Sequence, residues 1–152
     1  NCHKPGSESN PAAKVSHQTH ADKVTCFGCH SGAAYRNCNT CHGGHSASSP
    51  GMILGRNPRD KKTLTTLRLI PTVRDTFVPA GIKMENFDAL PNYWDTPAHN
   101  IRKRTDRTRN CDTCHVDRKN FLTKEMLIKN GSKANEDLIV EPKPIKKQEG
   151  KR

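Results

Sequence analysis

Hydrophobic residues are unevenly spaced along the chain, and few stretches keep a regular period. Residues 63–70 and 72–78 alternate between apolar and polar side chains, which predicts two short β-strands separated by Pro71. Strands this close in sequence are expected to form a small hairpin. Residues 121–128 are apolar enough to predict a short helix, which Gly131 and the residue before it would stop.

Composition divides the chain into four sections. Residues 1–45 and 99–130 hold all the cysteines and histidines, and the connector 46–98 holds none. Residues 131–152 are charged and contain two prolines, which predicts an extended tail that wraps a neighbour or stays mobile. Only one domain is expected from 152 residues.

The apolar content is low for an ordinary core. Only 32% of the 152 residues are hydrophobic and 5% are aromatic, and the mean hydropathy is −0.89. No apolar run approaches the roughly 18 residues of a membrane span, so no transmembrane segment is expected. A net charge of +11 would suit disorder, but seven cysteines and eight histidines would not. A group other than the side chains is therefore expected to supply part of the core.

Cysteine and histidine are adjacent four times, far more often than random scattering would give. Three of these pairs complete the sequence C-x-x-C-H, at residues 26–30, 38–42 and 111–115. This is the c-type haem attachment signature, in which two thiols add to the haem vinyl groups and the histidine ligates the iron. The expected attachment residues are Cys26, Cys29, Cys38, Cys41, Cys111 and Cys114.

The spacing suits this chemistry. In a helical turn, positions i, i+3 and i+4 share one face, so both sulfurs and the imidazole meet the same haem. The alternative is a zinc site, but zinc ribbons use paired C-x-x-C units and need no histidine after the second cysteine. A disulfide framework is disfavoured because the number of cysteines is odd.

The fourth pair is incomplete. Cys2 and His3 match the end of a motif whose first cysteine would precede residue 1. We therefore expect a longer protein with its signal peptide outside this chain. Haem attachment normally takes place outside the cytoplasm, so a periplasmic or extracellular location is expected.

The histidines match four haems in number. His3, His30, His42 and His115 follow a cysteine and are the expected proximal ligands, one on each of four c-type haems. The other four histidines are the expected distal ligands, and their pairing with particular haems is left open: His17, His20, His45 and His99. His45 lies too close to His42 in sequence to reach the other side of the same haem. No methionine is needed as a ligand.

Residues 1–45 and 99–115 resemble the multihaem c-type cytochromes, especially tetrahaem modules and the C-terminal parts of larger members. Residues 38–45, Cys-Asn-Thr-Cys-His-Gly-Gly-His, are the most characteristic stretch. The resemblance implies a loop-rich, haem-cored fold with little regular secondary structure and short helices at the C-x-x-C-H motifs. A small β-hairpin would cover one haem face. It also implies electron transfer along closely packed, low-potential haems with two histidine ligands each.

The basic charge has several interpretations. Haem propionates would pair with arginine and lysine and offset most of the formal charge. The basic residues cluster before the last motif and in the tail: Arg102, Lys103, Arg104, Arg107, Arg109, Lys143, Lys146, Lys147, Lys151 and Arg152. Solubility and acidic partners are further uses of this charge. Nucleic-acid binding is disfavoured because aromatic side chains for stacking are scarce.

Two classes of function remain. The first is an electron carrier or conduit with every iron six-coordinate, whose partners are redox proteins or further copies of this chain in an oligomer or filament. The second is part of a multihaem oxidoreductase with one open haem that acts on a small nitrogen or sulfur compound. Eight histidines for four haems leave no obvious open site, so the sequence favours the carrier.

Overall fold

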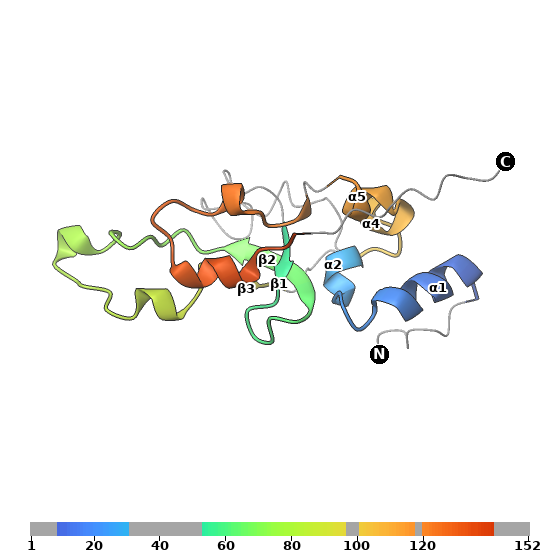
Figure 1. The fold of residues 1–152 in the computed structure, drawn as a ribbon, viewed down its shortest axis with the longest axis horizontal. Coiled ribbons are helices and arrows are strands. Elements are labelled where there is room, and N and C mark those ends of the chain that lie inside the picture. The colour runs from blue at the N-terminus through green and yellow to red at the C-terminus, as the bar shows by residue number, and fades with distance from the viewer. Residues whose placement is uncertain (1–8, 31–52, 97–100, 118–119, 142–152) are drawn as a thin grey trace.

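The fold is a small central sheet with short helices at one end. In the computed structural model, the described residues are 9–30, 53–96, 101–117 and 120–141. The helices gather on one side of the sheet, and residues 71–91 extend away on the opposite side (Figure 1). The helices are α1 (Pro11–His20), α2 (Cys26–His30), α4 (Asp106–Arg109) and α5 (Asp112–His115). The strands are β1 (Ile53–Arg56), β2 (Leu64–Leu69) and β3 (Tyr93–Asp95).

The sheet is an antiparallel meander in the order β1-β2-β3. Leu67 in the central strand pairs with Ile53 on one side and Asp95 on the other. Two isolated bridges extend the sheet, Val24 beside Leu64 and Leu54 beside Phe121. The chain before α2 and the chain after α5 are thereby both fastened to the sheet.

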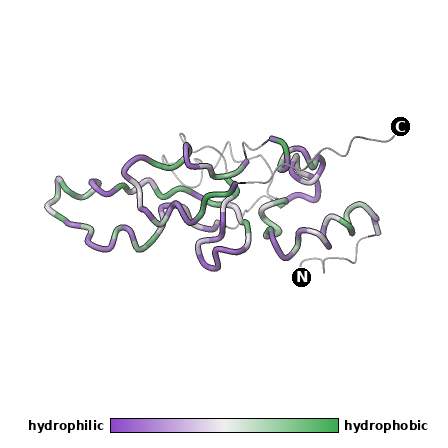
Figure 2. The backbone as a smooth tube through the Cα atoms, in the orientation of Figure 1, coloured by the Kyte–Doolittle hydropathy of each residue, from purple (hydrophilic) through white to green (hydrophobic). Residues whose placement is uncertain are grey.

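Among the described residues, the side-chain core lies in the sheet and the segments that cover it. Hydrophobic stretches run through the strands and are flanked by hydrophilic loops (Figure 2). One cluster of buried residues surrounds Leu67, and a second, smaller one surrounds Leu54. Helix α1, in contrast, contains no buried residue. The members of the first cluster are Ile53, Leu67, Tyr93, Leu122 and Leu138, and those of the second are Leu54, Phe121 and Val140.

The predicted strand at 63–70 is confirmed by β2, but the predicted hairpin with 72–78 is wrong. Residues 72–78 form turns that lead into a 3₁₀ helix at Val78–Ala80. One edge of β2 is instead taken by β1 and the other by β3. The physical reason is burial: Tyr93 packs in the core and its hydroxyl donates to the Met126 carbonyl at 3.0 Å, whereas Phe77 and Val78 are exposed.

Two further predictions near the C-terminus are wrong. The expected helix at 121–128 is an extended segment followed by a single 3₁₀ turn at Lys124–Met126, because Phe121 and Leu122 pair with β1 and are buried. The first part of the predicted tail is not extended. It forms a 3₁₀ helix at Lys133–Leu138, which buries Asn135 and Leu138 against the sheet. The rest of the tail, 142–152, lies outside the described residues.

Polar contacts fix the segments around the sheet. The Asn92 amide donates to the Thr72 carbonyl, and its side-chain oxygen accepts from the Ser132 backbone at 2.8 Å and the Asn135 amide at 3.0 Å. Arg74 pairs with Asp88 at 2.7 Å. These contacts hold the two ends of the 71–91 segment against the 3₁₀ helix at Lys133–Leu138.

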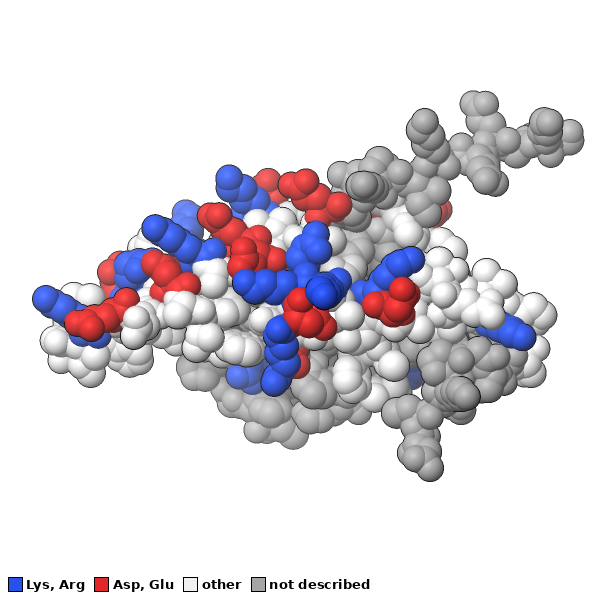
Figure 3. Space-filling view, turned by 60° about the horizontal axis from the view of Figure 1, so that its bottom comes forward, with Lys and Arg blue, Asp and Glu red and all other residues white. Residues whose placement is uncertain are grey.

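Basic and acidic side chains are interleaved on the face shown in Figure 3. Two of the ion pairs join Arg59 to Asp95 at 3.0 Å and Lys61 to Asp137. Within the part of the chain that the structure describes, no helix is long and apolar enough to cross a membrane.

A matched pair of leucine substitutions tests the position of the core. Leu67 is 1% exposed and Leu90 is 62% exposed. Leu67→Ala is expected to lower the free energy of unfolding by about 2–5 kcal/mol, because a buried cavity remains. Leu90→Ala is expected to change it by less than about 0.5 kcal/mol. Chemical denaturation of both variants checks this, and equal losses would contradict the assignment of the core.

Candidate haem-binding site

The first described motif is the whole of helix α2. Cys26, Cys29 and His30 lie within one helical turn, as the i, i+3, i+4 spacing predicts. Gly28 is buried where this turn meets the sheet, and a Cβ there would lie 2.6 Å from Val24 Cγ1 and 3.2 Å from Leu54 Cδ2. The glycine inside the motif therefore allows the turn to pack closely on its support.

The segment before α2 is joined to the start of β2 by an isolated β-bridge. The Thr25 backbone N–H donates to the Leu64 carbonyl at 2.8 Å, and the Leu64 N–H donates to the Lys23 carbonyl at 2.7 Å. The Thr25 hydroxyl also reaches the Thr65 hydroxyl at 3.1 Å. The connection between α1 and α2 is thus held by β2, which fixes where both helices can lie.

A distant segment satisfies the last carbonyls of α2. The last carbonyls of a helix have no hydrogen-bond partners inside the helix. In a helix of one turn, nearly all the carbonyls are of this kind. The Gly28 carbonyl accepts from Arg107 Nη1 at 3.1 Å, and the Cys29 carbonyl accepts from the Thr105 hydroxyl. The Arg102 backbone N–H donates to the His30 carbonyl at 2.9 Å. The first motif is therefore joined to the chain directly before the last motif.

The same segment orients the His30 ring. His30 Nδ1 lies 2.9 Å from the Arg102 carbonyl oxygen. Since a carbonyl oxygen only accepts, Nδ1 must carry the proton, and the lone pair is then on Nε2. Metal-bound histidines are typically held in this way through the second ring nitrogen.

The last described motif is centred on α5. The Cys114 and His115 backbone N–H groups both donate to the Cys111 carbonyl, at 3.2 and 2.9 Å. Cys111, Cys114 and His115 therefore also lie within one helical turn. Asn120 donates from its amide to the Thr113 carbonyl at 3.0 Å, which holds the outgoing chain against this turn.

Helix α1 places one histidine opposite each motif. The ring centroids of His17 and His30 are 5.9 Å apart, and those of His20 and His115 are 6.0 Å apart. The ring planes make angles of 41° and 52°. His20 Nδ1 lies 2.9 Å from the Ser16 carbonyl oxygen, so this ring also carries its proton on Nδ1 and its lone pair on Nε2.

These distances fit two imidazoles on opposite sides of one iron. A metal-bound imidazole nitrogen lies about 2.0 Å from the metal, which gives a centroid separation of about 6.3 Å for such a pair. Packed aromatic rings also lie roughly 4.5–7 Å apart, so the centroid distances fit ordinary ring packing as well. Helix α1 buries no residue, so His17 and His20 are not part of a side-chain core.

The thiols of the two motifs lie near each other. Burial, followed by the charge of Cys114, raises the pKa of Cys29 to about 11. Burial likewise raises the pKa of Cys114, against the opposing effect of Arg107. Both thiols are therefore protonated at neutral pH. None of the four described cysteines forms a disulfide.

The structure describes two of the four predicted motifs. It brings together His17, His20, His30 and His115 in two facing pairs. No group of three or more Cys, His, Asp or Glu side chains that could hold a metal ion occurs among the described residues. The other predicted site residues lie outside them: Cys2, His3, Cys38, Cys41, His42, His45 and His99.

Sequence reasoning missed the residues that support the site. Thr105 and Arg107 donate to carbonyls of α2, and the Arg102 backbone contacts His30. From the sequence, Arg102 and Arg107 are predicted to be partners of haem propionates. No local pattern signals a contact between 102–107 and α2, because such contacts depend on how distant parts of the chain meet.

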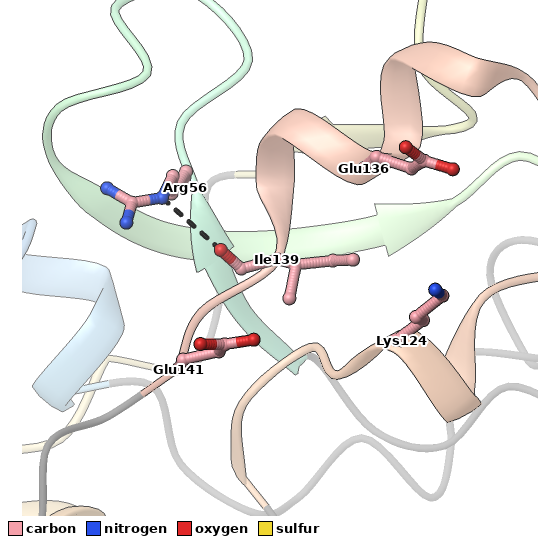
Figure 4. Close-up of a pocket in the computed structure, with 5 residues that line it drawn as sticks. All are labelled: Arg56, Lys124, Glu136, Ile139 and Glu141. Atoms are coloured by element: carbon pink, nitrogen blue, oxygen red, sulfur yellow. Dashed lines mark hydrogen bonds between the residues drawn. The ribbon is translucent and has the colours of Figure 1, made fainter.

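A separate hollow of about 370 Å³ lies between β1 and the C-terminal 3₁₀ helices (Figure 4). Arg56 Nε donates to the Ile139 carbonyl at 3.2 Å on one side of it. The described residues that line the hollow include two basic and two acidic side chains, and none of them is a cysteine or a histidine.

Comparison with known proteins gives no match: no family model, no curated protein and no solved structure is similar to this chain.

The raised pKa of Cys29 predicts a pH dependence of alkylation in the chain before haem attachment. Because the folded pKa is about 11, Cys29 stays protonated at pH 8, and its rate of reaction with iodoacetamide should keep rising towards pH 11. Exposed Cys26 and Cys111 should react first. Peptide mass spectrometry measures each rate. A Cys29 rate that levels off near pH 9, as for a free thiol, would contradict the packing of α2.

Proposed function

We propose that this chain is an electron-transfer protein that carries c-type haems, each with two histidine ligands. The observation that supports the proposal most strongly is the pairing of rings. Each described C-x-x-C-H turn faces a histidine of α1 at the separation expected for two axial ligands of one iron. Both the attachment residues and a sixth ligand are then available at each of these two turns.

The roles of the residues follow from their positions. Cys26 and Cys29 would attach one haem through thioether bonds, and Cys111 and Cys114 another. Attached haem supplies an iron that alternates between the ferrous and ferric states. His30 and His20 would ligate the iron through Nε2, because their Nδ1 atoms contact backbone carbonyls. Ligands held on both sides limit rearrangement when the oxidation state changes.

The same arrangement favours a carrier over an oxidoreductase. An oxidoreductase needs one iron with an open position and an acid, base or positioning residue beside it. At the two described turns, the His17 ring lies 5.9 Å from the His30 ring and the His20 ring 6.0 Å from the His115 ring, so each of these α1 histidines would serve as the second ligand. An open haem that acts on a small nitrogen or sulfur compound would have to be at one of the other two motifs.

The wider proposal comprises four haems in a chain related to the multihaem c-type cytochromes. Cys38 and Cys41, with His42, would hold the third haem, and Cys2 with His3 the fourth. His45 and His99 would complete their ligand sets. The protein would act in the periplasm or outside the cell, with redox proteins or further copies of itself as partners.

Haem content and spin state test this proposal together. We expect a pyridine haemochrome assay to give four haems per chain, and an electron paramagnetic resonance spectrum of the oxidised protein to be entirely low-spin. Cys111→Ala with Cys114→Ala should remove one haem and leave three. Fewer than three haems in the unaltered protein, or zinc by elemental analysis, would refute the proposal. A high-spin ferric signal would instead favour the oxidoreductase.

A further inference from the structure

Helix α1 presents two histidines to two different attachment turns. His17 and His20 are three residues apart, so they lie on neighbouring positions of one helix face. Each nevertheless faces a different proximal histidine, His30 in one case and His115 in the other. The sequence alone leaves the pairing of both histidines open.

The two turns are also tied to each other directly. The Arg102 N–H donates to the His30 carbonyl and the Arg102 carbonyl accepts from the His30 ring, across 72 residues of sequence. The Arg107 guanidinium donates to the Gly28 carbonyl only four residues before Cys111. The contacts made by residues 102–107 therefore hold the two turns near each other, and α1 brings one histidine ring close to each turn.

We propose that α1 is a shared ligand helix, with His17 completing the haem of residues 26–30 and His20 completing the haem of residues 111–115. These two haems are then nearest neighbours and exchange electrons directly, although their motifs are far apart in sequence. The inference rests on the proposed function, since it assigns ligands to haems that the motifs must first attach.

Deleting one haem at a time tests the assignment. In the protein with all its haems, His17→Ala and His20→Ala should each produce one haem per chain that binds carbon monoxide when reduced. In the Cys26→Ala, Cys29→Ala background, His17→Ala should produce none and His20→Ala should still produce one. In the Cys111→Ala, Cys114→Ala background the outcome should be reversed. Optical titration with carbon monoxide counts these haems.

A control lies on the same helix. Gln18→Ala changes an exposed residue between the two histidines and should leave every haem low-spin. The opposite pairing in the two backgrounds, or no carbon monoxide binding in either histidine variant, would overturn the assignment.

A second measurement covers the case in which a haem-deleted protein does not fold. His17→Met and His20→Met keep a ligand on the iron but should raise the potential of one haem each. Nuclear magnetic resonance of the oxidised protein can connect the shifted haem methyl signals to the thioether carbons of Cys26 and Cys29 or of Cys111 and Cys114. His17→Met should shift only the first set and His20→Met only the second, and any other result contradicts the shared helix.

The experiment distinguishes failure of the proposed function from failure of the shared ligand helix. If the protein binds no haem, the proposed function fails. If haems are present and low-spin but His17 and His20 serve other irons, only the shared ligand helix fails.

Discussion

The structure depends on how the last carbonyls of α2 find partners. A helix of one turn cannot satisfy them internally, so they must accept hydrogen bonds from elsewhere. Residues 102–107 supply all three donors, and Arg102 also accepts the Nδ1 proton of His30. One set of contacts thus completes the helix, selects the ring tautomer and brings the last motif beside the first described one. Loss of these contacts would disturb the end of α2, the tautomer of His30 and the position of the last motif together.

The site and the side-chain core are built differently. The sheet buries leucines against one another and is stabilised by ordinary hydrophobic packing. Helix α1 begins with an Asn10 cap whose side chain accepts from the Ala12 and Ala13 N–H groups, but it buries nothing of its own. An isolated helix of ten residues is marginal in water. The proposed haems, bound between α1 and the attachment turns, would supply burial that α1 lacks, in agreement with the low apolar content of the chain.

The helical geometry of the two described C-x-x-C-H turns could be predicted from the sequence because it is encoded locally. C-x-x-C-H places three functional groups within five residues, and a helical turn is enough to align them. The strand at 64–69 was also predictable from its alternation. The two strands that pair with it could not be predicted, because β3 is only three residues long and β1 only four. The 3₁₀ segment at Lys133–Leu138 was missed because its charged residues resemble a solvated tail, while Leu138 and Asn135 alone carry the burial.

The pairing of histidines could not be predicted, because it depends on how distant parts of the chain meet. This pairing changes the expected order of the proposed haems. The chain between His30 and Cys38 reaches at most about 29 Å when fully extended, so sequence spacing would keep the proposed haems of residues 26–30 and 38–42 close. Contacts through α1 and residues 102–107 support the haem of residues 111–115 as a neighbour of the first of these. We therefore expect the haem on α2 to lie between the other two. In a conduit, electrons would pass along an order set by the helix contacts and not by the order of motifs in the sequence.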